Sequence, residues 1–394
     1  MQTLLFAPRP IVLTDGQIRR EPTRPAALRP ADFAEQFDYD TLLFDSFFSR
    51  RNEVLVTAPP FFNLLTSIKR MHVTALPSGR RCSFRVRTLD RHSQIRIAVP
   101  DGTEKLILDS EVGKFTVEPQ PNRGDFFAGR RVIFTQSKNN RFEWLQDWIR
   151  YNRDVHGADA VLIYDNQSTD YSRQELLIAL SELSGIERVC IVNWPFRFGP
   201  QGLDSWHYWD SDFAQNGAWE HARWMFLQQA RSAMSSDIDE LTVSEDGSGV
   251  FEAAERSRLG IVRYDGYWVY GFQGMTREAS NASPIRVVDF DHYQRRYLVR
   301  RWGILPVREW TTVCPPKWTV VPSRCPARTQ WTPHRIKGWL VSALLFDHNF
   351  SFRHFREIST HWKYDRTSRK IFDAGSYAFD QRMRASFAAV QWTA

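Results

Sequence analysis

The stretch that decides the fold runs over residues 132–194 and begins VIFTQSKNNRFEWLQDWIRYNRDVHGADAVLIYDNQSTD. Short apolar runs at 132–135, 160–166 and 188–194 alternate with two longer segments in which the apolar residues recur at helical spacing. Short apolar runs of this kind are typical of strands in a parallel sheet, because helices cover both faces of such a sheet. The pattern predicts a βαβαβ unit with right-handed crossovers.

Signals at the helix ends agree with this unit. The first helix is expected over residues 141–156 and should stop at Gly157, since glycine readily adopts the left-handed conformation that closes a helix. Ser172 and Glu175 have the spacing of a capping box that opens the second helix. Ligands bind at the carboxyl ends of the strands in such sheets, so the loop at residues 165–170 is a candidate binding loop.

The residues before this unit have a different pattern. Residues 67–118 alternate apolar and polar side chains between turn sequences, which predicts antiparallel strands and hairpins. Residues 1–60 carry several prolines and are expected to be irregular. We therefore predict an α/β protein with an irregular and β-rich N-terminal domain at residues 1–124 and an α/β domain, which would hold the functional site, at residues 125–394.

A pair of acidic residues follows a long helix expected at residues 215–234. Asp237 and Asp239 would point the same way in an extended segment. Two neighbouring carboxylates repel each other unless a cation lies between them, and oxygen ligands suit Mg²⁺ or Mn²⁺. The pattern predicts a metal site, although many surface loops contain the same pattern. Residues 232–236, SAMSS, are less apolar than a buried strand, so the strand before the motif is expected to be short or exposed.

The amino-acid composition indicates which classes of partner the protein could bind. The formal charge of +7 suits an anionic ligand, an anionic polymer or an anionic membrane surface, and equally a solvated basic surface. No nucleic-acid-binding signature is present, so no nucleic-acid partner is expected. The 15 tryptophans suit both a core and a carbohydrate site, because sugar C–H groups pack on aromatic faces.

The cysteines and the N-terminus bear on location. The four cysteines form no C-x-x-C pair, which favours a reducing compartment and no structural zinc, although spacing alone allows a Cys314–Cys325 disulfide. We see no signal peptide and no run of 18 apolar residues. These features predict a cytoplasmic protein, with peripheral contact at the inner face of the membrane left open.

Six segments, in order over residues 132–366, carry a family resemblance. They are SKNNRFEWLQDWIRYNRDVHGADAVLIYDNQSTD (137–170), QNGAWEHARW (215–224), DIDEL (237–241), YWVYGFQG (267–274), KWTVVP (317–322) followed by His334, and RHFREIST (353–360). Together they resemble the GT-A glycosyltransferases of the family 92 and family 2-like group. In the first segment the matching residues are Lys138, Asn139, Trp144, Leu145, Trp148, Gly157, Tyr164, Asp165, Asn166, Ser168 and Asp170. Asn140 stands where the family has an acidic residue.

The resemblance implies a GT-A fold, a Rossmann-like mixed or parallel sheet flanked by helices. It implies transfer of a sugar from a nucleotide-diphosphate donor, expected to be a UDP-sugar, with Mn²⁺ or Mg²⁺ as cofactor. The acceptor would be a glycan or glycolipid in surface polysaccharide or lipopolysaccharide synthesis. Among the implied roles, Asp239 is the principal metal ligand and Asp237 lies near the ribose or the metal. His334 is a third ligand candidate, and its alternative is a structural histidine.

Other roles follow from the same resemblance and from residue chemistry. The nucleotide would lie near Asp165, Asn166 and Asp170, whose alternative role is an Asx-turn that caps the next helix. Three basic residues are candidates for contact with the diphosphate, or else belong to a solvated basic face: Lys317, Arg353 and Arg356.

The catalytic base is left open. An inverting enzyme needs a carboxylate to accept the acceptor proton, for which Asp265 and Glu240 are candidates, whereas a retaining enzyme needs none. Two other function classes were weighed. A metal-dependent nucleotidyl- or phosphotransferase would favour a Gly-rich phosphate loop, and no G-x-x-x-x-G-K is present. A non-catalytic carbohydrate-binding protein would explain the tryptophans but not Asp237 and Asp239.

Overall fold

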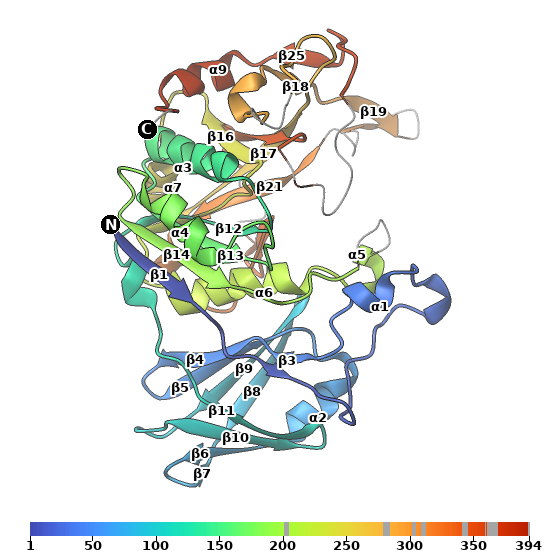
Figure 1. The fold of residues 1–394 in the computed structure, drawn as a ribbon, viewed down its shortest axis with the longest axis vertical. Coiled ribbons are helices and arrows are strands. Elements are labelled where there is room, and N and C mark those ends of the chain that lie inside the picture. Colours follow the sequence, from blue (N-terminus) through green and yellow to red (C-terminus); the bar gives the residue numbers. More distant parts are fainter. Residues whose placement is uncertain are drawn as a thin grey trace.

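The computed structural model describes residues 1–200, 205–278, 284–301, 305–308, 313–340, 346–358, 360 and 369–392. It is a mixed α/β protein built on one large sheet, to which 11 of the described strands belong, with several smaller sheets beside it. The smaller N-terminal sheets lie at one end of the molecule and the C-terminal segments at the other (Figure 1).

Half of the large sheet is parallel. Its strands run in the order β1 (Gln2–Phe6), β14 (Arg188–Asn193), β13 (Ala160–Asp165), β12 (Arg131–Ser137) and β15 (Ser232–Ser235). All neighbouring pairs in this half are parallel. The helices α3 (Phe142–His156) and α4 (Arg173–Ser181) connect β12, β13 and β14. The predicted βαβαβ unit is therefore confirmed.

Local sequence signals set the ends of these elements as expected. Gly157 ends α3 with a φ of 74°, and Ser172 and Glu175 form the capping box of α4. The strand β13 is buried at all six positions, since α3 and α4 pack on one face of the sheet and α6 (Phe213–His221) packs on the other.

The other half of the sheet is mostly antiparallel. It contains β21 (Cys314–Val320), β17 (Ile261–Val269), β18 (His292–Gln294), β25 (Tyr377–Phe379), β24 (Phe350–Phe355) and β16 (Glu240–Ser244). Only β17 and β24 pair in parallel among these described strands. Further elements here are α5 (Ser205–Tyr208), α7 (Val250–Arg256) and α9 (Gln381–Ala388). Two antiparallel pairs complete this part: β19 (Leu298–Arg301) with β20 (Leu305–Arg308), and β22 (Gln330–Thr332) with β23 (Arg335–Lys337).

The β-rich N-terminal part consists of two four-stranded antiparallel sheets, which confirms the expected strands and hairpins. One sheet runs β4 (Asp45–Arg50), β5 (Glu53–Ala58), β9 (His92–Ala98), β8 (Phe84–Leu89). The other runs β11 (Gly113–Val117), β10 (Lys105–Ser110), β6 (His72–Leu76), β7 (Arg80–Arg81). A separate hydrophobic core lies between them, beside α2 (Leu65–Arg70). Helix α6 lies between these sheets and the large sheet (Figure 1).

The expectation that residues 1–60 are irregular is wrong. Besides β4 and β5, this segment forms β1, the short pair β2 (Ile11–Val12) and β3 (Thr41–Leu43), and α1 (Phe33–Gln36). The prolines begin only at Pro8, so residues 2–6 are able to donate and accept the hydrogen bonds of a strand. They pair with β14, which makes β1 the edge of the large sheet.

The prediction of one long helix at residues 215–234 is also wrong. Helix α6 ends at His221, one π-helical turn continues to Phe226, and β15 follows. That strand is short, as expected, yet all four of its residues are buried. Its serines are tolerated there because their hydroxyls are bonded: Ser235 Oγ accepts from Trp219 Nε1 at 2.9 Å, and Ser232 Oγ donates to Glu255 at 2.8 Å.

Two further observations bear on the earlier expectations. None of the described helices has the length and apolar character needed to cross a membrane. The four cysteines are free, so the Cys314–Cys325 disulfide that the spacing allowed does not form. Cys314 is buried in β21, whereas Cys325 belongs to the loop beyond that strand.

Candidate functional site

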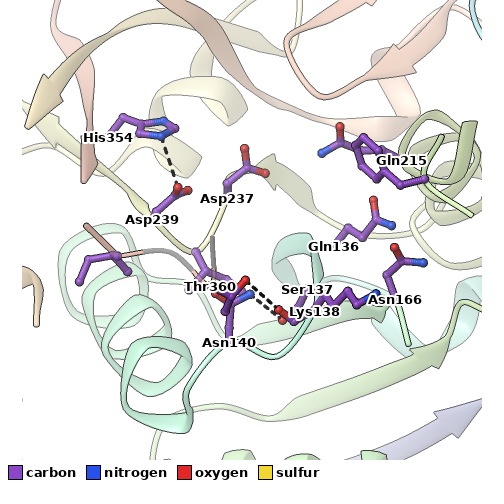
Figure 2. A pocket seen from close by; sticks show the side chains of 13 residues that line it. Gln136, Ser137, Lys138, Asn140, Asn166, Gln215, Asp237, Asp239, His354 and Thr360 are labelled. Atoms are coloured by element: carbon purple, nitrogen blue, oxygen red, sulfur yellow. Dashed lines mark hydrogen bonds and ion pairs between the residues drawn. The ribbon is translucent and has the colours of Figure 1, made fainter. Parts of the chain in front are cut away.

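A cavity of about 120 Å³ lies at the carboxyl ends of the parallel strands (Figure 2). The chain fills the sheet from β12 through β13 to β14 on one side and then crosses to β15 on the other side of β12. This reversal is a topological switch point, the place where open α/β sheets bind ligands. The cavity is lined by Gln136, Ser137, Lys138, Asn140, Asn166, Phe198, Gln215, Asp237, Ile238, Asp239, His354, Ile358 and Thr360.

One end of the cavity is formed by amide side chains. Gln136, Asn166 and Gln215 gather there, opposite the acidic residues (Figure 2). Asn166 is fixed, because its Nδ2 donates to the carbonyl oxygens of Trp194 and Phe196, each at 2.8 Å. Gln136 is different, since its amide nitrogen and oxygen are both buried and neither has a hydrogen-bond partner. A buried amide without partners offers one donor and one acceptor to a ligand.

The other end carries the D-x-D pair. Asp237 and Asp239 do not lie in an extended segment, as the sequence suggested, but in a turn between β15 and β16. The turn is closed by the Glu240 N–H, which donates to the carbonyl oxygen of Asp237 at 3.1 Å. Both aspartates nevertheless line the same cavity. The shared orientation expected from the sequence is thus reached through a turn.

A histidine that the sequence analysis did not assign stands beside Asp239. His354 Nε2 lies 3.3 Å from Asp239 Oδ2 (Figure 2). Its Nδ1 lies 3.2 Å from Glu240 Oε1. Burial lowers the pKa of His354, but Asp239 and Glu240 outweigh burial and raise this pKa to about 9. The imidazole is therefore a cation beside the D-x-D turn at neutral pH.

Lys317 is placed differently from the diphosphate contact expected for it. Only 1% of its side chain is exposed, and its Nζ lies 2.7 Å from Asp237 Oδ2 and 2.9 Å from Glu240 Oε2. Burial opposes its charge, yet Asp237 and Glu240 raise the pKa of Lys317 above its ordinary value. Lys317 thus holds the D-x-D turn in place from the interior of the protein.

The cluster as a whole keeps a negative charge. Three carboxylates, Asp237, Asp239 and Glu240, face the two cations Lys317 and His354. Within the described ranges, no three His, Cys, Asp or Glu side chains form a group arranged to hold a metal ion. Asp237 and Asp239 nevertheless present carboxylate oxygens, the atom type that Mg²⁺ prefers, at the cavity surface.

The candidates in the loop after β13 divide between the cavity and its surroundings. Asn166 lines the cavity, whereas Asp165 is buried beside it and shapes the loop. Asp165 Oδ1 accepts from the Ser168 N–H at 3.3 Å, and Arg173 lies 3.5 Å from the other oxygen. Asp170 is exposed and does not line the cavity. Asp165 thus bonds the backbone of its own loop, while the next helix is capped by Ser172, so the alternative of an Asx-turn that caps this helix is not observed.

The other expected residues lie away from this cavity. Successive residues of a strand point to opposite faces, so Arg353 points away from the side that His354 occupies. Arg353 is buried and paired with Asp380. Asp265 Oδ2 lies 3.0 Å from Arg296 Nη1, and Asp265 and Arg353 line a second cavity.

Arg356 and His334 are not part of the lining either. The Arg356 guanidinium lies over the rings of Trp268 and Tyr270, 5.4 Å from each centroid. His334 lies in the turn between β22 and β23. The sequence signal that could have found His354 is its place next to Arg353 in the quoted RHFREIST segment.

We expect Gln136→Leu to stabilise the protein while weakening ligand binding. A buried polar group without a partner costs about 1–3 kcal/mol, and leucine has a similar volume, so the free energy of unfolding should rise by about 1 kcal/mol. Urea unfolding measures this change, and nucleotide titration measures the loss of affinity. The exposed Gln174→Leu serves as the control and should change neither quantity. A destabilised Gln136→Leu with unchanged affinity would contradict this role.

No protein-family model matches the chain, and no curated protein sequence matches it. Because one fold can carry many unrelated activities, support for a function comes from the residues of this cavity. These residues are an unpartnered amide at one end and an acidic turn with a cationic histidine at the other.

Proposed function

We propose that the chain is a metal-dependent GT-A-type glycosyltransferase that moves a sugar from a nucleotide-diphosphate donor, a UDP-sugar, to a glycan or glycolipid. The observation that carries the proposal is the position of Asp237 and Asp239. Both aspartates line the cavity at the switch point of the parallel sheet, opposite its amide side chains. This is where a sheet of this topology binds a nucleotide, and the resemblance of the six sequence segments points to the same chemistry.

The donor set fits a hard divalent cation. Mg²⁺ is usually held by one or two carboxylates together with substrate phosphates, and Mn²⁺ also suits carboxylate ligands. Asp237 and Asp239 would hold such an ion, with His354 beside them. The ion would neutralise the diphosphate leaving group. A complete set of protein ligands is not required, because phosphate oxygens of the donor would supply the rest.

Residues of the chain would do the rest by binding and positioning. Gln136 and Asn166 lie at the end of the cavity that would take the nucleoside, and Lys138 adds a cation for phosphate oxygens. Glu240 is buried, and Lys317, His354 and the Asp237 N–H all contact its oxygens, so it positions the turn. The proposal assigns no catalytic base, since Asp265 lines a different cavity.

The wider setting belongs to the proposal as well. The net charge of +7 suits anionic acceptors and an anionic membrane surface. We infer a cytoplasmic enzyme of surface polysaccharide or lipopolysaccharide synthesis, in peripheral contact with the inner face of the membrane.

Calorimetric titration of UDP and GDP, with and without Mn²⁺, tests the proposal. We expect UDP to bind in the presence of Mn²⁺ and at least about tenfold more weakly without it, which corresponds to about 1.4 kcal/mol. Failure of both nucleotides to bind under any metal condition would contradict the proposal and favour a carbohydrate-binding protein. Release of pyrophosphate from a nucleoside triphosphate would instead indicate a nucleotidyltransferase.

A further inference from the structure

A third hollow, distinct from the cavity at Asp265 and Arg353 and rich in arginine, lies where the N-terminal sheets meet the large sheet. This groove of about 760 Å³ opens between the β4–β5 hairpin, β8 and β9 on one side and the loop at residues 326–328 on the other. It is lined by Arg50, Glu53, Arg85, Val86, Arg87, Arg96, Ala327 and Arg328. None of these residues lines the cavity of the candidate donor site.

Positive charge in the groove is largely uncompensated. Its lining holds five guanidinium groups and one carboxylate, a surplus of four positive charges. The carboxylate of Glu53 is already engaged, by Arg96 Nη1 at 2.6 Å and by Ser49 Oγ at 2.6 Å. Among the described residues, the side chains of Arg50, Arg85 and Arg328 make no hydrogen bond or ion pair. These three guanidinium groups can therefore bind an anion without breaking an existing ion pair.

Arg87 shows the effect of this charge. Its Nη2 donates to the carbonyl oxygen of Arg328 at 2.9 Å, which links the two walls of the groove. Burial lowers the pKa of Arg87, Glu220 opposes this change, and the neighbouring Arg96, Arg223 and Arg328 lower the pKa further. Like charges held this close favour a bound anion between them.

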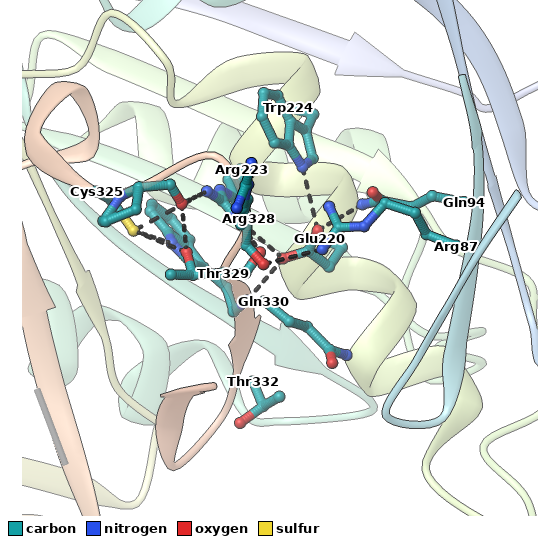
Figure 3. A network of polar contacts seen from close by, with 12 residues as sticks. Arg87, Gln94, Glu220, Arg223, Trp224, Cys325, Arg328, Thr329, Gln330 and Thr332 are labelled. Carbon is teal, nitrogen blue, oxygen red and sulfur yellow. Dashed lines mark hydrogen bonds and ion pairs between the residues drawn. The ribbon is translucent and has the colours of Figure 1, made fainter. Parts of the chain in front are cut away.

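A buried polar network fixes both walls in place (Figure 3). Glu220 of α6 accepts from Gln94 Nε2 of β9 at 2.5 Å, from the Trp331 N–H at 2.6 Å and from Trp224 Nε1 at 3.1 Å. Arg223 donates to carbonyl oxygens of the loop that forms the opposite wall, at Thr329 (2.5 Å) and Pro326 (2.8 Å). The groove is thus part of the folded structure, because charged and polar groups of three separate segments hold it.

The spacing of the cations suits a linear chain. Arg85 and Arg87 are alternate residues of β8, so their Cα atoms lie about 7 Å apart on one face. Arg96 of β9 stands directly opposite Arg85. A row of guanidinium groups matches repeated carboxylate, sulfate or phosphate groups, which it binds in a two-pronged geometry.

The remaining lining distinguishes among anionic partners. Among the described residues that line it, Val86 and Ala327 are apolar and none is aromatic. Single-stranded nucleic acid is usually held by bases stacked on aromatic rings. Peripheral membrane binding adds burial of large apolar side chains, which this lining lacks. We propose that the groove binds a linear anionic polysaccharide.

This proposal goes beyond the donor site and needs no nucleotide. Full-length protein is titrated with polygalacturonate, with neutral dextran as the comparison, at several salt concentrations. The variant Arg50→Glu/Arg85→Glu reverses two exposed groove cations. The control Arg51→Glu/Arg256→Glu makes the same change of net charge at exposed positions outside the groove. Thermal unfolding verifies that both variants are folded.

We expect the parent to bind polygalacturonate but not dextran, with an affinity that falls as salt rises. The groove variant should bind at least about tenfold more weakly and the control within about twofold of the parent, because only groove cations contact the chain. Equal losses in both variants, or no binding by the parent at low salt, would overturn the proposal. Tighter binding of a single-stranded oligonucleotide or of anionic vesicles through the same arginines would also overturn it, since the occupant would then be of another class.

Discussion

Asp239→Asn is expected to abolish Mn²⁺-dependent binding of UDP. The substitution keeps the size of the side chain and removes the negative charge that would attract a divalent ion. We expect affinity in the presence of Mn²⁺ to fall by about 100-fold or more, which corresponds to about 2.7 kcal/mol. Calorimetric titration at matched Mn²⁺ concentrations measures the change. Residual binding should no longer depend on the metal.

Asp170→Asn is the matched control for this experiment. It makes the same chemical change at an exposed aspartate that does not line the cavity. The affinity of this variant for UDP should stay within about twofold of the parent, because salt largely screens a solvent-exposed charge that does not contact the ligand. If Asp239→Asn bound UDP with unchanged affinity and unchanged metal dependence, Asp239 would not be a metal ligand.

Lys317→Met is expected to destabilise the whole protein. The Lys317 ammonium is the charged partner of two carboxylates, Asp237 and the buried Glu240. Removing one member of a buried ion pair leaves an uncompensated charge, which costs about 3–5 kcal/mol. Urea unfolding should therefore show a much lower midpoint. Lys317→Arg, which keeps the charge, should recover part of the loss.

Lys138→Met separates this structural role from a ligand contact. Lys138 lines the cavity, and its side chain makes no ion pair within the part of the chain that the structure describes, so its removal should leave the free energy of unfolding within about 0.5 kcal/mol of the parent. Its effect should fall on nucleotide affinity. A Lys317→Met protein as stable as the parent, with weaker nucleotide binding, would restore the original expectation that Lys317 contacts the diphosphate.

The parts of the fold that the sequence predicts are those with local signals. The strands β12, β13 and β14 read as short apolar runs, and the ends of α3 and α4 are marked by Gly157 and a capping box. The strand β15 has no such signal, because its Ser-Ala-Met-Ser sequence is held by neighbours on both sides and by partners for its hydroxyls. Tertiary contacts, not propensity, make it a strand.

The candidate site divides in the same way. Asp237 and Asp239 are visible as a motif within three residues. The contact between Asp237 and Lys317 joins positions 80 residues apart, and no local sequence pattern reports a contact of that kind. The choice between His334 and His354 likewise depends on which segment pairs with β16, and the register there sets His354 opposite Glu240.

The edge strand β1 has a consequence for handling the protein. Its residues are mostly exposed, yet it covers one side of β14, whose central four residues are buried. Removing residues 2–6 would leave the backbone groups of an apolar strand, VCIV, unpaired along an open edge. Such edges pair readily with other chains, so the shortened protein would tend to aggregate. Expression designs should therefore keep this segment intact and place no bulky fusion directly against it.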